Sequence, residues 1–130
     1  MKQDITNVIL SLASNVRQEE NIIMAEERLQ SLFSAISFSR MMRTEAIGVS
    51  VSKEYINVIA TGSTRLEYDA LKAAIKALEH DMGRTEKGKH NGMIPIDIDI
   101  MQYGGQRYKA DDWHKPFNVI LLKEMEAESK

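Results

Sequence analysis

Two acidic residues alternate with isoleucines between Ile94 and Met101, a segment that reads Ile-Pro-Ile-Asp-Ile-Asp-Ile-Met. Side chains two positions apart on a strand point to the same face, so Asp97 and Asp99 stand side by side opposite the isoleucines. Neighbouring carboxylates repel each other unless a positive group lies near them. A hard divalent cation, an arginine or a lysine would meet this need. The alternative is an edge strand with a solvated acidic face, because Asp-x-Asp alone is a weak motif.

A basic, glycine-containing segment precedes this strand. Residues 84–92 read Arg-Thr-Glu-Lys-Gly-Lys-His-Asn-Gly and predict a mobile loop. Magnesium held by one or two carboxylates usually completes its shell with water and substrate phosphates, and cationic side chains then neutralise phosphate oxygens. Acidic strand and basic loop together favour phosphoryl-transfer chemistry. An ordinary solvated connection is the alternative, in which Arg84 only complements the dipole of a preceding helix.

Length and composition indicate a single domain over residues 1–130. The chain has no cysteine, which excludes disulfides and thiolate sites and fits a cytoplasmic location. A net charge of -2 gives no basic field for nucleic acid. No apolar run approaches the roughly 20 residues of a membrane span, and the N-terminus does not resemble a signal peptide. None of these features specifies an oligomeric state.

Hydrophobic periodicity predicts the elements that carry these residues. Helices are expected over Glu19–Ile36 and from the capping box Thr64-x-x-Glu67 to Gly83, with Lys72 and Lys76 facing outward. Strands are expected over Asn7–Leu12, Ser37–Thr44, Tyr55–Thr64 and the acidic segment, with a loop over Glu45–Lys53. Phe117–Leu122 suits a strand or a helix, and a frayed tail over Glu124–Lys130 follows.

The order of these elements predicts an α+β fold. Strand, helix, strand, strand, helix and strand give a ferredoxin-like βαββαβ core, with a four-stranded antiparallel sheet, two helices on one face and a short C-terminal extension. This fold hosts many activities, so function has to be inferred from the site residues.

Several motifs together resemble the 6-hydroxymethyl-7,8-dihydropterin pyrophosphokinase family, from about Val8 to Tyr103. They are Leu12-Ala13-Ser14-Asn15, Arg43-Thr44 with Gly48, Tyr55-Ile56-Asn57, Leu78-Glu79 to Gly83-Arg84, and Ile96-Asp97-Ile98-Asp99-Ile100-Met101 with Tyr103-Gly104. The resemblance implies a magnesium-dependent transfer of pyrophosphate from ATP, the co-substrate, to the hydroxymethyl group of the pterin in folate biosynthesis, with release of AMP.

The resemblance also implies a role for individual residues. On the metal and pterin side it makes Asp97 and Asp99 the Mg²⁺ ligands, and the pterin pocket is formed by Thr44, Tyr55, Asn57 and Phe117. On the nucleotide side it makes Arg84 a catalytic arginine at the start of the mobile loop and places Glu79 near ATP, while Lys87 and Lys89 could add positive charge there.

The chain departs from the family pattern in ways that bear on catalysis. Ile94 stands where the family has an arginine, Ala13 where it has a glycine, and Lys109 and Ala110 where it has a His-Tyr pair. The sequence therefore favours an enzyme with a slow or altered transfer. Two alternatives are a family-like domain that binds a pterin or nucleotide without turnover, and a structural domain with a remnant acidic strand.

Overall fold

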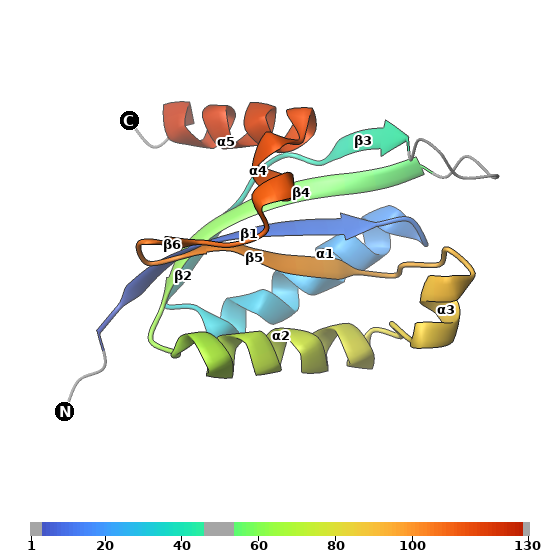
Figure 1. Cartoon of the computed structure of the whole chain (residues 1–130), viewed down its shortest axis with the longest axis horizontal. Helices are drawn as coiled ribbons and strands as arrows, with labels where there is room; N and C mark the ends of the chain where they lie inside the picture. The colour runs from blue at the N-terminus through green and yellow to red at the C-terminus, as the bar shows by residue number, and fades with distance from the viewer. Residues whose placement is uncertain (1–3, 46–53, 129–130) are drawn as a thin grey trace.

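The computed structural model describes residues 4–45 and 54–128, which form a mixture of strands and helices (Figure 1). The strands are β1 (Thr6–Ser14), β2 (Ala35–Phe38), β3 (Met42–Glu45), β4 (Glu54–Thr64), β5 (Asp97–Tyr103) and β6 (Gln106–Arg107). The helices are α1 (Gln18–Leu29), a 3-10 turn (Gln30–Leu32), α2 (Tyr68–Asp81), α3 (Glu86–His90), α4 (Ala110–His114) and α5 (Pro116–Glu128).

The strands form one antiparallel sheet of six strands, so the predicted count of four is wrong. Its order is β2-β4-β1-β5-β6, and β3 pairs with the other end of β4. The expected strand over Ser37–Thr44 is divided, because the chain leaves the sheet after Phe38 and returns at Met42. Ser39 marks the break, since its hydroxyl accepts a hydrogen bond from Ile59 N. Such a break depends on the partner strand and has no local sequence signal.

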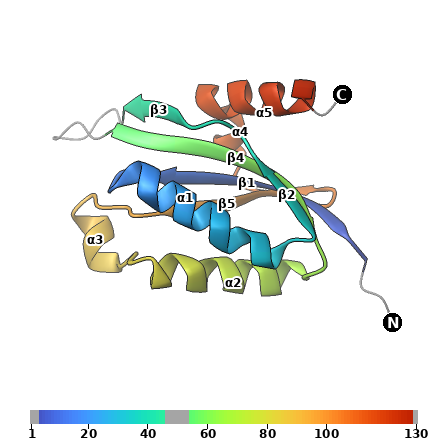
Figure 2. The ribbon, with the colours of Figure 1, turned by 180° about the vertical axis from the view of Figure 1, so that it is seen from behind.

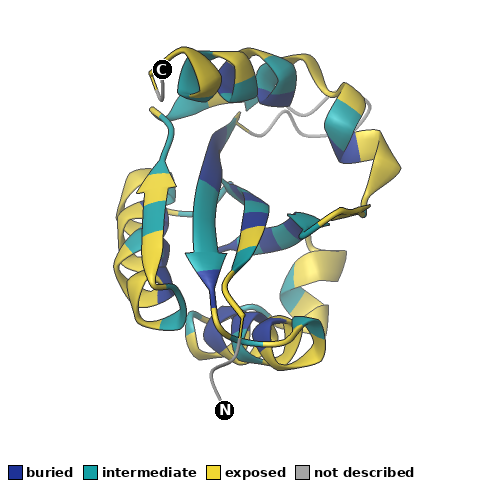
Figure 3. Cartoon of the chain, turned by 90° about the vertical axis from the view of Figure 1, so that its left-hand side faces the viewer, coloured by how far each residue is buried: buried dark blue, intermediate teal, exposed yellow. Residues whose placement is uncertain are grey.

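Helices cover both faces of the sheet (Figures 1 and 2). Helices α1 and α2 pack on one face, as predicted, over a core that includes Leu10, Leu12, Ile22 and Leu71. Helix α5 covers part of the opposite face through a smaller buried cluster of Ile59, Met101 and Leu121. Figure 3 shows exposed residues on the outer sides of the helices and buried ones toward the sheet. The segment Phe117–Leu122, for which the sequence allowed a strand or a helix, is helical and belongs to α5.

Two local predictions about helix ends are wrong. Helix α1 ends at Leu29, and Ile36 belongs to β2, because pairing of Ala35–Phe38 with β4 overrides the helical period. The expected capping box does not form. The Thr64 hydroxyl donates to Leu32 O at 2.7 Å and accepts from Leu66 N, and α2 begins only at Tyr68. The predicted glycine end of α2 is confirmed, since Gly83 has φ of 99°.

The remaining connections are more regular than expected. The segment predicted as a mobile loop contains α3, whose first turn is capped by the Thr85 hydroxyl accepting from Gly88 N. Helix α5 continues to Glu128, so the frayed tail from Glu124 is wrong. Most of the loop expected over Glu45–Lys53, including Gly48, lies outside the described residues. No helix in the described ranges is both long enough and apolar enough to span a membrane.

Candidate active site

The aspartates of β5 share one sheet face, as their alternation predicts. Ile96, Ile98 and Ile100 are buried on the opposite face in the core beneath α1 and α2. The side chains of Asp97 and Asp99 stay 37% and 25% exposed. Within the described residues, the first half of β5 pairs with β1 alone, because β6 reaches only Gln102 and Tyr103. The acidic pair therefore stands at a free edge of the sheet.

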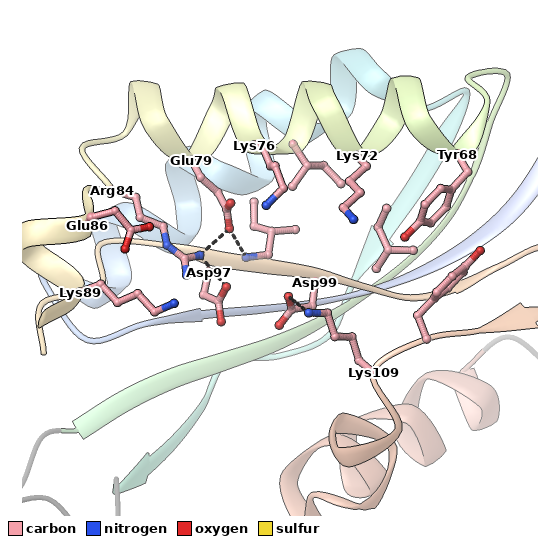
Figure 4. Close-up of a pocket in the computed structure, with 14 residues that line it drawn as sticks. Tyr68, Lys72, Lys76, Glu79, Arg84, Glu86, Lys89, Asp97, Asp99 and Lys109 are labelled. Atoms are coloured by element: carbon pink, nitrogen blue, oxygen red, sulfur yellow. Dashed lines mark hydrogen bonds and ion pairs between the residues drawn. The ribbon is translucent and has the colours of Figure 1, made fainter.

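Each aspartate has a basic partner from a different element. Arg84 Nη1 lies 2.6 Å from Asp97 Oδ1, and Lys109 Nζ lies 3.6 Å from Asp99 Oδ1 (Figure 4). Burial raises the pKa of the Asp99 carboxyl, the charge of Asp97 raises it further, and Lys109 opposes the rise. Negative charge at Asp99 is thus only partly compensated, and a further cation there would be favourable.

Protein ligands for such a cation are few. Among residues 4–45 and 54–128, no group of three or more His, Cys, Asp or Glu side chains could hold a metal ion. Asp97 and Asp99 offer two carboxylates on one face. An ion bound by them would take its remaining ligands from water and from phosphate oxygens, which suits Mg²⁺ better than a metal that needs an all-protein cage.

Glu79 is a buried carboxylate that ties α2 to the acidic strand. Its Oε2 accepts a hydrogen bond of 2.7 Å from Ile98 N and one of 2.8 Å from Arg84 Nη1. Burial raises the pKa of Glu79, while the Ile98 N–H and the Arg84 charge act against the rise. The prediction that Glu79 lies near a nucleotide is untested. Its contacts show that it positions both β5 and Arg84.

Arg84 follows the end of α2 and faces the free edge of β5. Besides Glu79 and Asp97, its Nη1 contacts Ile96 O at 3.4 Å. The position agrees with the alternative reading, in which a cation at a helix C-terminus complements the dipole, and it also brings the guanidinium to Asp97. Its predicted catalytic role is untested.

A cleft of about 530 Å³ opens along this edge between α2 and β5. Its charged lining residues are Lys72, Lys76, Glu79, Arg84, Glu86, Lys89, Asp97, Asp99 and Lys109 (Figure 4). Of the two loop lysines predicted to face a nucleotide, the structure brings Lys89 to the cleft and leaves Lys87 exposed outside its lining. Sequence analysis did not identify Lys72 and Lys76 as site residues, although their helical spacing places them on one stripe with Glu79.

The cleft has an aromatic end beyond the lysines. The rings of Tyr68 and Tyr108 are stacked with centroids 4.7 Å apart, and Tyr103 meets Tyr68 edge-on at 5.6 Å. The Tyr103 hydroxyl donates to Leu66 O at 2.6 Å, which fixes the group to the chain before α2. One end of the cleft is therefore ionic and the other offers flat apolar surface.

A second group of predicted residues meets at the neighbouring end of β3 and β4. Thr44 pairs directly with Tyr55, and Asn57 pairs with Met42. Asn57 is buried, and its Nδ2 donates to Thr44 Oγ1 at 2.7 Å and to Met42 O at 3.3 Å. The structure thus brings Thr44, Tyr55 and Asn57 together, as predicted. Contact with a pterin is untested.

Strand register connects the two groups. Asn57 of β4 pairs with Ala13 of β1, and Ala13 pairs in turn with Asp97 of β5. Directly paired residues of antiparallel strands share a face, so Asn57, Ala13 and Asp97 form one row across the sheet. Two strand spacings separate its ends by roughly 10 Å. Only the methyl group of Ala13 stands between them.

Asn15 fixes the segment that enters β5. Its Nδ2 donates to Gly92 O at 2.7 Å, and its Oδ1 accepts from Ile94 N at 2.7 Å. Its backbone N–H also donates to Ile94 O at 3.0 Å. These bonds attach residues 92–94 to the end of β1 and so help to align Asp97 with Ala13.

Phe117, the remaining predicted site residue, lies apart from both groups in the sequence, on α5. It lies in the first turn of α5, is partly exposed and belongs to neither buried cluster. Its stacking on a pterin stays a prediction. Trp113 borders the same region, where its Nε1 donates to Met101 O and Tyr108 O, both at 3.0 Å.

Comparison with known proteins identifies the relatives of this chain. A model of the 7,8-dihydro-6-hydroxymethylpterin-pyrophosphokinase family matches residues 9–127. A protein named 2-amino-4-hydroxy-6-hydroxymethyldihydropteridine pyrophosphokinase from Porphyromonas gingivalis is 31% identical over 100 residues, covering 72% of this chain and 67% of the relative. A protein of the same name from Aquifex aeolicus is 31% identical, covering 76% of this chain and 62% of the relative.

Larger proteins contain a similar region. A folate synthesis bifunctional protein of Arabidopsis thaliana is 30% identical over 128 residues, which is 91% of this chain but 26% of the relative. The chain therefore spans about a quarter of the length of this relative.

Proposed function

Because the chain belongs to the 7,8-dihydro-6-hydroxymethylpterin-pyrophosphokinase family, we propose that it transfers pyrophosphate from ATP to 6-hydroxymethyl-7,8-dihydropterin in folate synthesis. In this reaction the hydroxymethyl oxygen forms a bond to the β-phosphorus of ATP. The bond from that phosphorus to the α,β-bridging oxygen breaks, AMP leaves with the electron pair, and the hydroxyl group loses its proton.

The row Asn57–Ala13–Asp97 is the observation that carries this proposal. It aligns the predicted pterin group and the acidic pair on one sheet face, roughly 10 Å apart across two strand spacings. An acceptor beside Asn57 and a phosphate chain beside Asp97 would then lie on the same surface. Such alignment of acceptor and donor is the main contribution that a protein makes to phosphoryl transfer.

Asp97 and Asp99 would hold Mg²⁺. The fit rests on two partly exposed carboxylates that share a face, and on the raised pKa of Asp99, which reflects burial and repulsion from Asp97. When bound, Mg²⁺ supplies neutralisation of phosphate oxygens. Arg84 already contacts Asp97 and would remain beside it to bind the same phosphates.

The cleft between α2 and β5 would hold the nucleotide. Lys72, Lys76 and Lys89 bring positive charge to its walls, as a triphosphate requires. The stacked pair Tyr68 and Tyr108 would lie at the base end. Glu79 acts by positioning β5 and Arg84, while Lys87 contributes at most a distant charge.

The pterin would lie against Thr44, Tyr55 and Asn57, with Phe117 on its other side. The strand order β2-β4-β1-β5 with α1 and α2 on one face supports the ferredoxin-like assignment of the core. A cytoplasmic location is part of the same proposal and rests on the cysteine-free sequence.

Binding without turnover is the second candidate. Ile94, at the position of a family arginine, has no charge, and it does not figure among the residues that line the cleft. Loss of one transition-state donor typically costs about 10²–10³ in rate. A domain with this change could bind Mg²⁺ and ATP while transferring pyrophosphate very slowly.

An assay at high enzyme concentration decides between these functions. The protein is mixed with Mg²⁺, ATP and 6-hydroxymethyl-7,8-dihydropterin, and AMP and the pterin diphosphate are measured by chromatography and mass spectrometry. Equal amounts of both products, absent with an Asp97→Asn, Asp99→Asn variant, are expected. If AMP does not exceed that control while calorimetry still detects binding of α,β-methylene-ATP, the protein binds without turnover.

A further inference from the structure

Lys109 differs from Arg84 in how firmly it is held against the acidic pair. Arg84 contacts three acceptors, and its side chain is 24% exposed. In the described part of the chain, Lys109 forms an ion pair with Asp99 alone, at 3.6 Å, and its side chain is 56% exposed. The arginine is thus held by several contacts in a partly buried network, whereas the lysine has one long contact and can be displaced.

The backbone directs Lys109 toward the cleft. It is one of two non-glycine residues with positive φ in the described ranges, with φ of 56° and ψ of 61°. Its neighbours hold it there, since Tyr108 N donates to Met101 O and Asp112 N donates to Lys109 O, both at 2.9 Å. A non-glycine residue in this left-handed backbone conformation is retained only when the surroundings enforce it.

The ammonium group of Lys109 and a divalent cation would compete for one carboxylate. Asp99 is only 25% exposed, so its oxygens are accessible from few directions, and Lys109 approaches from the cleft. A metal ion that approaches Asp99 from the cleft would therefore meet the ammonium group of Lys109. A triphosphate in the cleft would offer the displaced group a new anionic partner.

We propose that Lys109 couples metal binding to nucleotide binding. This inference rests on the proposed function in that the cleft must accept a metal-nucleotide complex. Without nucleotide, Lys109 neutralises Asp99 and opposes metal entry. With nucleotide, it moves to the phosphates and leaves Asp99 to the metal. Metal and nucleotide then strengthen each other's binding by the same factor, as linkage requires.

Binding of Mn²⁺, followed by electron paramagnetic resonance with and without α,β-methylene-ATP, tests this coupling. The test variant is Lys109→Met, which keeps the side-chain stem and the same backbone demand but removes the charge. Lys109→Arg restores the charge. Lys76→Met is the matched control, because Lys76 lines the same cleft and forms no ion pair within the described ranges. Circular dichroism and thermal unfolding establish that each variant is folded.

We expect Lys109→Met to bind Mn²⁺ alone about three- to tenfold more tightly than the unmodified protein, as removal of a partly exposed ion-pair partner implies. In saturating Mn²⁺, Lys109→Met should bind α,β-methylene-ATP about three- to tenfold more weakly than the unmodified protein does. The increase in Mn²⁺ affinity caused by the analogue should be smaller in this variant. Lys109→Arg should resemble the unmodified protein, and Lys76→Met should leave binding of Mn²⁺ alone within about twofold.

Tighter binding of Mn²⁺ together with weaker binding of the analogue in Lys109→Met is the result that distinguishes this coupling. The inference is overturned if Lys109→Met does not bind Mn²⁺ more tightly, if Lys76→Met has the same effect, or if the analogue helps Mn²⁺ equally in both proteins. Failure of pyrophosphate transfer with intact coupling would contradict only the proposed reaction. Transfer without coupling would contradict only the role of Lys109.

Discussion

The Glu79 carboxylate accepts a hydrogen bond of 2.7 Å from the backbone N–H of Ile98, the residue between the two aspartates of β5. This N–H lies at the strand edge that faces α2 and away from β1. A buried N–H without an acceptor is costly, so a side chain takes the place of a missing neighbouring strand. Glu79 thereby stabilises the acidic strand and leaves its edge open to the cleft.

Replacement of Glu79 should reveal this positioning role. Glu79→Ala removes an acceptor from both Ile98 and Arg84 and should lower the free energy of unfolding by about 1–3 kcal/mol. Glu79→Gln keeps an oxygen that can accept from Ile98 and should lose less. Urea unfolding measures both. Equal losses in the two variants would show that the bond to Ile98 does not stabilise the strand. Weaker binding of α,β-methylene-ATP with unchanged stability would favour a direct nucleotide contact instead.

Replacement of Asp99 separates metal binding from folding. Asp99→Asn should reduce pyrophosphate transfer by about 10²–10³, the typical cost of losing one electrostatic contribution. Binding of Mn²⁺ should weaken in the same variant. Stability at neutral pH should rise, because a carboxylate that is partly buried and repelled by Asp97 becomes neutral. Steady-state kinetics and thermal unfolding provide these readouts.

Asp111→Asn is the control for this prediction. Asp111 is an exposed acidic residue of α4 that does not line the cleft. The Asp111→Asn variant loses one negative charge, as Asp99→Asn does, but outside the cleft, so its rate of pyrophosphate transfer should change little. An unchanged rate in Asp99→Asn would contradict the metal assignment.

The hydrogen bonds of Asn15 should restrict the segment that enters β5. Asn15→Ala removes two side-chain bonds and should destabilise the protein by about 1–2 kcal/mol. Amide hydrogen exchange at Ile94 should become faster, since its N–H loses Asn15 Oδ1 as acceptor. Asn15→Asp retains that acceptor and loses only the bond to Gly92 O. If Ile94 exchanges at the same rate in all three proteins, Asn15 does not restrain the segment.

Arg40 and Glu124 should give the protein a measurable pH dependence. Hydrogen bonding by the Arg40 guanidinium, at 2.8 and 3.0 Å, holds the pKa of the Glu124 carboxyl below its ordinary value. A lowered folded-state pKa stabilises the protein above the unfolded-state value of 4.5. The contribution is lost as the pH falls through the folded-state pKa.

Unfolding of Glu124→Gln measures this contribution. The unmodified protein should lose more stability than the variant as the pH falls from about 5 to about 3. Thermal melts at low salt follow the difference, because the pair is exposed and screened by ions. Parallel curves for the two proteins would show that the Arg40–Glu124 pair does not stabilise the attachment of α5.

Local periodicity predicted the elements whose burial follows one simple pattern. The helical stripe that includes Leu71 and Ile75 forms α2, and the alternation of isoleucine with aspartate forms β5. The aliphatic run that forms β1 and the β-branched segment that forms β4 were also predicted as strands. Prediction was wrong where a distant partner decides. Ile36 continues a helical stripe in sequence, yet it joins β2 because β4 offers backbone hydrogen bonds there. The Thr64 hydroxyl likewise contacts Leu32 O, which a local capping motif does not specify.

By itself, the sequence determined that Asp97 and Asp99 share a face, because side-chain direction on a strand repeats every two residues and needs no partner. Its motifs also determined the family. Only the tertiary structure decided that Arg84 and Lys109 lie against the pair and that Asn57 aligns with Asp97 through Ala13. These relationships depend on strand register and chain reversal, which arise from packing between segments that are distant in sequence.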